Sequence, residues 1–153
     1  MRIEVTNQQP QIVIATKVEA ISMDQIAEAV DTGYTKLLAC IEEQAIQIAG
    51  PPYCCYMNGN EDFSQFDIEL GIPVNGAVSA KDALYMSQSC EGKAITATHK
   101  GPYQTLETAY MALMDYAREN ELELTGVYYD YYLSDPADTP ESELLTQVVF
   151  PVR

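Results

Sequence analysis

Apolar and polar residues follow two different periods along this chain, and these periods predict both strands and helices. Residues 11–19 (QIVIATKVE) are apolar and rich in β-branched side chains, which favours a strand. Residues 22–32 are typical of a short helical turn. From Gly33 onward, apolar residues recur at steps of three and four until Gly50–Pro52, so we predict an amphipathic helix that these helix-breaking residues end.

Two strands joined by a polar loop are predicted next. They cover residues 53–57 and 66–72, and in the second strand apolar residues alternate with Asp67, Glu69 and Gly71. The same order returns in the second half, with strands at 83–88 and 93–99, a helix at 102–119 and strands at 127–133 and 144–152. The sequence therefore predicts an α+β fold built from duplicated βαββ units.

Two short matches support the duplication. Tyr34-x-x-Leu37 matches Tyr103-x-x-Leu106, and Ile72-Pro73-Val74 matches Phe150-Pro151-Val152. The offsets of 69 and 78 positions predict that the second unit has gained about nine residues between the two markers. We expect a single domain over residues 1–153, with repeats at about 10–75 and 82–153. A DNA-binding domain is not expected, because only about ten residues precede the first predicted strand.

The charge of the chain limits its partners. Eight Lys and Arg residues against 23 Asp and Glu residues give a net charge of −15. Such a chain repels nucleic acids and anionic membranes and favours cationic partners. The first 20 residues lack the long apolar core of a signal peptide or membrane anchor, so we expect a cytoplasmic protein.

The chemistry-bearing residues predict no cofactor and no metal site. The four cysteines show no CxxC spacing, and His99 is the only histidine, so we expect reduced, mainly buried thiols. Serine nucleophile motifs and phosphate-binding glycine loops are absent from the sequence. No catalytic residue is therefore assigned, and whether the chain is an enzyme stays open. For His99, a hydrogen bond at a strand end is a simpler explanation than catalysis.

The segment VYYDYYLSDP, residues 127–136, places an aspartate among tyrosines. Because side chains alternate along a strand, Tyr128, Asp130 and Tyr132 share one face, opposite Tyr129, Tyr131 and Leu133. A carboxylate among aromatic rings loses hydration, so it needs hydrogen bonds from phenols, a proton or a cationic ligand. The alternative is that Asp130 faces solvent on a half-exposed strand.

Three motifs together resemble the GyrI-like, or AraC-type effector-binding, domain family. They are His99-Lys100-Gly101-Pro102-Tyr103-x-x-Leu106, then Tyr129-Asp130-x-Tyr132-Leu133-x-Asp135-Pro136-x-x-Thr139-Pro140, and Leu145-Thr146-x-x-x-x-Pro151-Val152. The resemblance implies duplicated units with pseudo-twofold symmetry, an antiparallel sheet packed with two main helices, and a ligand pocket between the halves. In that family a glutamate that pairs with cationic ligands often stands where this chain has Asp130, whose side chain is one methylene shorter.

The resemblance extends the list of candidate ligand-binding residues. We expect Glu69 or Asp67 to approach the pocket from the opposite half, because the strand of Glu69 is expected to hold the same place in the first repeat as that of Asp130. A solvated polar face is the alternative for Glu69. Other candidate wall residues are Tyr53, Tyr56, Phe66 and Tyr110, although tyrosines at helical spacing are more often part of a core.

Three functions follow from the pattern and the resemblance together. The first is a stand-alone effector-binding module for amphipathic, cationic, drug-like molecules. An acidic interaction protein of the gyrase-inhibitor type is the second, with a basic partner such as a topoisomerase subunit. A hydrolase of strained cyclopropane-type electrophiles is the third, and its chemistry would rest on Asp130, Glu69 and a tyrosine. A homodimer is possible in each case.

Overall fold

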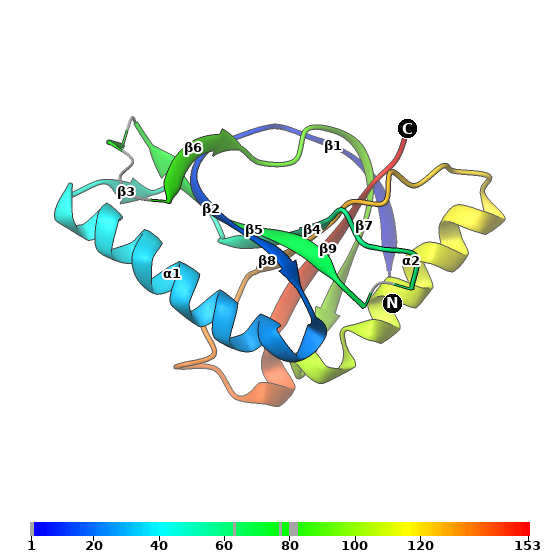
Figure 1. The fold of residues 1–153 in the computed structure, drawn as a ribbon. Helices are drawn as coiled ribbons and strands as arrows, with labels where there is room; N and C mark the ends of the chain where they lie inside the picture. The colour runs from blue at the N-terminus through cyan, green and yellow to red at the C-terminus, as the bar shows by residue number, and fades with distance from the viewer. Residues whose placement is uncertain (1, 63, 77, 80–82) are drawn as a thin grey trace. The chain divides into compact units, whose positions relative to one another are not determined.

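The computed structural model describes residues 2–62, 64–76, 78–79 and 83–153. The chain forms two compact units, Pro10–Cys90 and a second one that combines Met1–Gln9 with Glu91–Arg153. Each unit contains antiparallel strands and one main helix (Figure 1), which confirms the predicted α+β class. The single-domain organisation and the pocket between the halves stay predictions.

In the described residues of the unit Pro10–Cys90, five strands accompany helix α1. The elements are β2 (Ile12–Ile21), the 3-10 turn η1 (Met23–Gln25), α1 (Ile26–Glu43), β3 (Gln47–Ile48), β4 (Tyr53–Met57), β5 (Phe66–Asn75) and β6 (Leu84–Gln88). The strand order is β4-β5-β2-β6, all pairs are antiparallel, and the short β3 pairs with β5.

Helix α1 packs on the face of this sheet that carries Thr16 and Leu70. A Cβ atom added at Gly33 would overlap Leu70 and touch Thr16, so the absence of a side chain lets the helix approach closely. The helix begins at Ile26, about two turns before the predicted start at Gly33, and ends at Glu43, before the predicted end at Gly50. The backbone N–H of Ser22 donates to Gln25 Oε1 at 3.0 Å, and this cap starts the helical segment early.

The second unit contains four strands and helix α2. Its elements are β1 (Ile3–Gln8), β7 (Gly92–Lys100), η2 (Tyr103–Thr105), α2 (Glu107–Glu119), β8 (Tyr128–Tyr132), η3 (Glu141–Glu143) and β9 (Leu145–Pro151). The strand order is β1-β7-β9-β8, again antiparallel. Strand β1 was not predicted, because its residues IEVTNQ are largely polar and only the backbone pairing with β7 makes it a strand.

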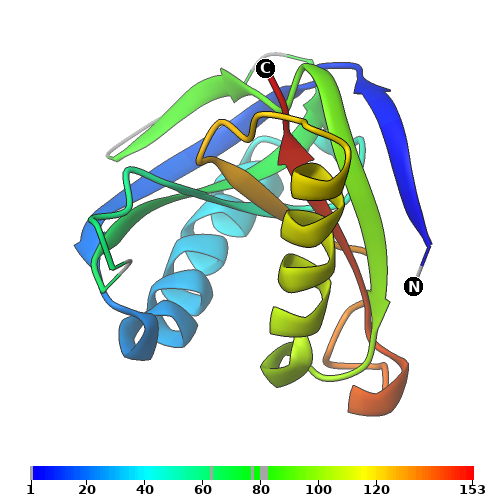
Figure 2. The same cartoon turned by 90° about the vertical axis from the view of Figure 1, so that its right-hand side faces the viewer.

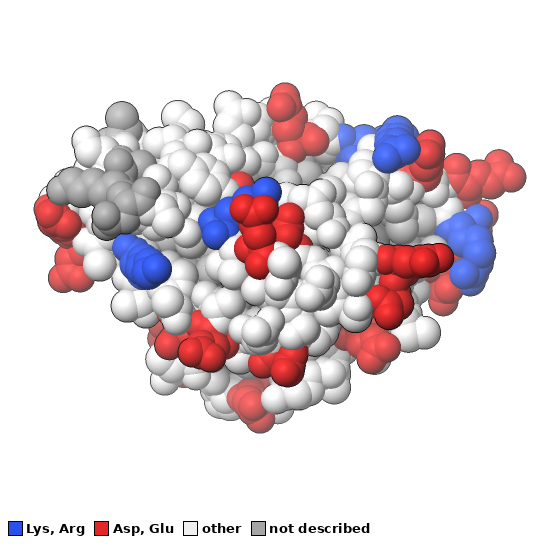
Figure 3. Space-filling view, viewed as in Figure 1, with Lys and Arg blue, Asp and Glu red and all other residues white. Residues whose placement is uncertain are grey.

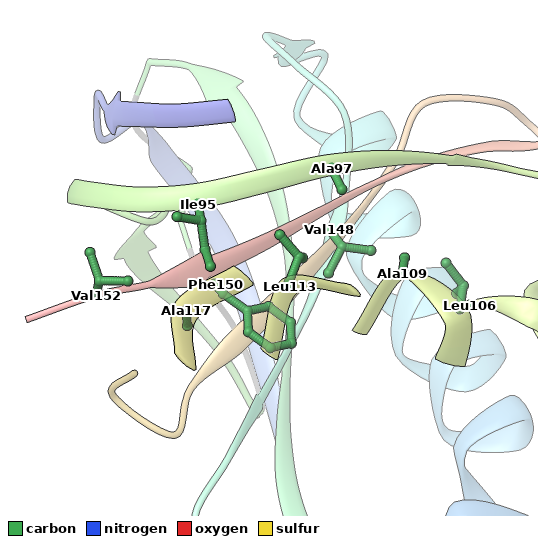
Figure 4. Packing of buried hydrophobic residues seen from close by; sticks show 9 residues of the cluster. All are labelled: Ile95, Ala97, Leu106, Ala109, Leu113, Ala117, Val148, Phe150 and Val152. Atoms are coloured by element: carbon green, nitrogen blue, oxygen red, sulfur yellow. The ribbon is translucent and has the colours of Figure 1, made fainter. Parts of the chain in front are cut away.

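Helix α2 lies along one face of this sheet, as Figure 2 shows for the yellow-green helix. Its buried positions Ala109, Leu113 and Ala117 recur every four residues, as expected of a helix that packs one face on a sheet. They pack on side chains of β7 and β9, including Ile95 and Phe150 (Figure 4). The other members of this core cluster are Ala97, Leu106, Val148 and Val152.

The element order repeats between the two units. Strand, helix, strand, strand is β2-α1-β4-β5 in one unit and β7-α2-β8-β9 in the other, if the short β3 is left aside. The sheet orders β6-β2-β5-β4 and β1-β7-β9-β8 also match. Strands β1 and β6 therefore hold the same position, at the edge next to β7 and β2, respectively. In the sequence, β1 directly precedes β2 and β6 directly precedes β7, so each strand pairs with the sheet of the other unit's first strand.

The expected gain of nine residues is wrong, because one of the two sequence markers was misplaced. Tyr103 begins η2, whereas Tyr34 lies inside α1. Counted from Met23, which begins η1, Tyr103 follows 80 positions later, and Pro151 follows Pro73 by 78. The spacing between corresponding elements is thus nearly constant along the two units.

Gly71 offers a direct test of packing in the unit Pro10–Cys90. It is paired with Tyr53, and a Cβ atom at Gly71 would lie 2.5–2.6 Å from two ring carbons and the hydroxyl oxygen of that tyrosine. We expect Gly71→Ala to lower the free energy of unfolding by about 1–3 kcal/mol, because the fully buried ring has to move. Urea denaturation followed by circular dichroism measures this change.

A double-mutant cycle identifies the cause of that loss. In a Tyr53→Ala background the ring is gone, so Gly71→Ala should cost less than about 0.5 kcal/mol. An equal loss in both backgrounds would show that the ring contact is not responsible.

Candidate functional site

Asp130 lies in the middle of β8 and is fully buried, with 0% of its surface exposed. It is paired with Val148 of β9, a member of the core cluster under α2, so its side chain shares the face that α2 covers. The hydroxyl of Tyr110 in α2 donates a hydrogen bond of 2.6 Å to Asp130 Oδ2. The predicted alternative, a solvent-facing Asp130, is therefore wrong.

Aromatic residues on the same face of the sheet lie near Asp130 along β8. Tyr110 lies 5.1 Å from Tyr128 between ring centroids, and Tyr128 lies 5.3 Å from Phe150. At the other end of β8, Tyr132 meets Tyr103 of η2 edge to face at 5.6 Å. We call Asp130 together with Tyr103, Tyr110, Tyr128 and Tyr132 the Asp130 cluster.

The two-face prediction for β8 is confirmed. Tyr128 and Tyr132 contact aromatic residues of the face that α2 and η2 cover. Tyr129 and Tyr131 stack on each other at 5.9 Å and belong to the opposite face. Tyr110 was predicted as a candidate wall residue, although its helical spacing is more typical of a core. It packs against the core cluster and donates a hydrogen bond to Asp130.

The hydrogen bond from Tyr110 and the burial of the phenols affect the electrostatics of the Asp130 cluster. Tyr110 donates a hydrogen bond to the Asp130 carboxylate, and a phenol that donates in this way holds more electron density in its ring, which strengthens attraction to a cation. Burial, together with the charge of Asp135, raises the pKa of Tyr103, so this hydroxyl stays protonated at neutral pH.

Glu69 forms a separate group in the unit Pro10–Cys90. Its carboxylate accepts hydrogen bonds of 2.7 Å from Tyr53 at Oε1 and from Tyr85 at Oε2. Burial raises the pKa of Tyr85, and the hydrogen bond to Glu69 and the charge of Glu69 add to this shift. Glu69 is paired with Lys17, next to the Thr16–Leu70 pair that faces α1, so Glu69 lies on the face opposite this helix.

The expectation that Glu69 holds the same place as Asp130 is wrong. Asp130 lies on β8, the first strand after α2, which corresponds to β4 after α1. Glu69 lies on β5, the counterpart of β9. The two acids thus occupy different strands of the repeat, and only Asp130 faces the helix of its own unit.

Tyr56 and Phe66 form a third group, with ring centroids 5.7 Å apart. Both are buried. Tyr56 is paired with Ile68, and Phe66 and Ile68 lie at even spacing from Leu70, so both rings lie on the α1 side of their sheet, opposite Glu69. The eight predicted site residues therefore divide into Asp130 with Tyr110, Tyr128 and Tyr132; Glu69 with Tyr53; and Tyr56 with Phe66. Tyr85 was missed, because no local pattern relates β6 to Glu69.

Other site chemistry is limited in the described residues. Within the ranges that the structure covers, no three His, Cys, Asp or Glu side chains come together as a metal site. The four cysteines are free and buried, as predicted, and burial raises the pKa of Cys90 to about 11. In the same part of the chain, no helix is both long and apolar enough to cross a bilayer.

His99 is the last buried residue of β7, and 4% of its surface is exposed. Its Nε2 atom lies 2.9 Å from the hydroxyl of Thr105 in η2, which confirms the hydrogen bond expected at this strand end. Burial lowers the pKa of His99, because the imidazolium loses hydration.

The sequence of this chain matches the profile of a known protein family. The sequence profile of the GyrI-like small molecule binding domain matches residues 1–153. The chain belongs to this family. A search of curated proteins gave no match.

Solved structures share the GyrI-like fold with this chain at low sequence identity. The C-terminal domain of EcmrR is 20% identical with a TM-score of 0.80, and the match covers 99% of this chain and 97% of that domain. In the EcmrR–DNA complex the identity is 22% and the TM-score 0.77, and this chain spans 57% of that longer protein.

Two further solved structures with a similar fold differ in what their descriptions say. SAV2435 was solved bound to tetraphenylphosphonium, with 12% identity, a TM-score of 0.70 and coverage of 100% and 94% of the two chains. A hydrolase encoded by lin2189 from Listeria innocua has 12% identity, a TM-score of 0.69 and coverage of 99% and 92%. At such identities these likenesses show the fold alone.

Removal of the Tyr110 hydroxyl tests the hydrogen bond to Asp130. We expect Tyr110→Phe to lower the free energy of unfolding by about 1–3 kcal/mol, because the buried carboxylate loses a donor. Tyr116→Phe on the same helix is the control, with an expected change within about 0.5 kcal/mol. Equal effects in urea denaturation would show that the bond adds nothing specific.

The lowered pKa of His99 predicts a pH dependence of stability. The unfolded imidazole binds a proton at about pH 6.5, above the pKa in the folded protein, so the free energy of unfolding should fall as pH drops below about 6.5. His99→Gln should remove this slope between pH 7 and 5.5, where no other histidine titrates. Parallel pH profiles of the two proteins in urea denaturation would contradict the assignment.

Proposed function

We propose that this GyrI-like chain binds amphipathic, cationic small molecules at the Asp130 cluster. One observation carries the proposal: a fully buried carboxylate receives a phenol hydrogen bond and lies among tyrosines that are themselves partly exposed. A ligand can therefore stack on the rings while its charge interacts with the acid behind them.

The energetics of such a site favour lipophilic cations over neutral molecules. A well-placed ring contributes about 0.5–2 kcal/mol of cation–π attraction. Burial of the apolar parts of the ligand adds about 25 cal/mol per Å². At about 5.5 Å and an effective dielectric constant of 20, Asp130 would contribute about 3 kcal/mol for a unit positive charge. This last contribution distinguishes a cation from a neutral molecule of the same shape.

The surface of the chain supports the same charge preference. Acidic side chains are spread over the face shown in Figure 3, and basic ones are fewer, in line with the net charge of −15. Such a surface attracts cations at long range and repels phosphate backbones. We infer an effector-binding role in the cytoplasm without direct contact to nucleic acid. The tetraphenylphosphonium complex of SAV2435 makes this ion a suitable first probe.

Asp130→Asn tests the proposed site, because it removes the charge and keeps the shape. We expect the affinity for tetraphenylphosphonium to fall about 10- to 100-fold and the affinity for neutral triphenylphosphine oxide to change less than about twofold. Isothermal titration calorimetry measures both. Asp115→Asn on the exposed side of α2 is the matched control, since it changes the net charge equally.

Three other results would contradict the proposal. Equal losses of affinity for both probes would show that the charge of Asp130 does not take part in ligand recognition. Binding that survives Asp130→Asn but falls steeply with salt would indicate the acidic surface and a basic protein partner. Repeated turnover of a cyclopropane-containing electrophile would indicate a hydrolase instead.

A further inference from the structure

Two buried polar atoms of the unit that contains α2 have no hydrogen-bond partner among the described residues. They are Nδ1 of His99 and Oγ1 of Thr146, on residues that are 4% and 0% exposed. Buried polar side-chain atoms in proteins are nearly always hydrogen-bonded to protein or to ordered water. A pair of such atoms therefore indicates a missing partner.

The two atoms belong to neighbouring side chains. His99 of β7 is paired directly with Thr146 of β9, so both side chains leave the same face of the sheet, with Cβ atoms about 5 Å apart. Thr146 is paired in turn with Tyr132 of β8. The row His99, Thr146 and Tyr132 thus lies on the α2 side, two residues along the strand from Asp130.

Hydrogen bonds around Thr105 assign the roles of the two imidazole nitrogens. The Thr105 hydroxyl donates its single hydrogen to the carbonyl oxygen of Pro102 at 2.9 Å. When both contacts form at once, the same hydroxyl oxygen, 2.9 Å from His99 Nε2, acts as the acceptor and Nε2 carries the proton. In the neutral ring Nδ1 is therefore an acceptor, and it needs a donor.

We propose that His99 Nδ1 and Thr146 Oγ1 form a subsite for one hydroxyl group beside the Asp130 cluster. The hydroxyl donates its hydrogen to Nδ1 and its oxygen accepts the hydrogen of Thr146. A water molecule fills this role in the free protein, and a ligand hydroxyl replaces it. This assignment rests on the proposed function, in which Asp130 holds the positive charge.

The subsite narrows the ligand class. Thr146 stands diagonally from Asp130 on the neighbouring strand, which places their Cβ atoms about 7–8 Å apart. A cation that carries a hydroxyl group at about this distance satisfies both sites at once. The preferred ligands are therefore hydroxylated lipophilic cations, and cations without a hydroxyl leave the bound water in place.

Nitrogen NMR tests the subsite without any ligand, since His99 is the only histidine of the chain. In the free protein at neutral pH, Nδ1 should resonate downfield of the protonated Nε2. It should lie moderately upfield of an unprotonated imidazole nitrogen that accepts no hydrogen bond. Thr146→Val should move the resonance downfield, because the bridging water loses its second partner, and Thr146→Ser should restore it. An Nδ1 resonance that is the same in all three proteins would overturn the assignment.

Ligand binding provides the second test, with tetraphenylphosphonium and its mono(4-hydroxyphenyl) derivative as the two probes. The hydroxylated ion should bind about two- to tenfold more tightly than its parent in the natural protein and in Thr146→Ser. Thr146→Val should abolish this preference. Thr98→Val, on the exposed face of β7, should keep it.

The outcomes separate the subsite from the proposed function. If the parent ion binds but the preference for the hydroxylated ion is absent or survives Thr146→Val, the subsite is wrong and the Asp130 cluster stands. If neither ion binds, the cation proposal fails, and the Nδ1 resonance still decides whether His99 and Thr146 hold a hydroxyl group.

Discussion

The hydrogen bond from Tyr110 to Asp130 is the interaction on which the candidate site depends. A carboxylate that is fully removed from water is costly unless donors replace its hydration. Tyr110 can supply a donor only because α2 packs its small residues closely on β7 and β9. The core under α2 and the chemistry of Asp130 are thus parts of one arrangement, and a loss of packing there would also change the site.

The two units use one element order for different chemistry. In the unit with α2, a buried acid and several tyrosines lie between the helix and the sheet. In the other unit the corresponding face carries apolar residues such as Leu70, while its acid, Glu69, is on the opposite face and is held by two phenols. A repeated fold therefore does not imply repeated sites, because the two acids lie on strands that do not correspond and on opposite faces of their sheets.

Recognition by charge and recognition by hydrogen bonds would have separate locations in this protein. Asp130 would select for positive charge and tolerate varied shapes, since cation–π attraction has little directional demand. His99 and Thr146 would add a directional requirement one row away on the same face. Such a division would let a GyrI-like domain accept many lipophilic cations and still prefer those with one well-placed hydroxyl group.

The sequence by itself determined the types of most elements and the two faces of β8, because these follow from local periodicity. It also identified Asp130 among its tyrosines. Only the tertiary structure decided that α2 covers the Asp130 face, that β1 joins β7, and that Tyr85 reaches Glu69. These outcomes depend on strand register and helix packing between distant residues, and no periodicity in a single stretch of chain records them.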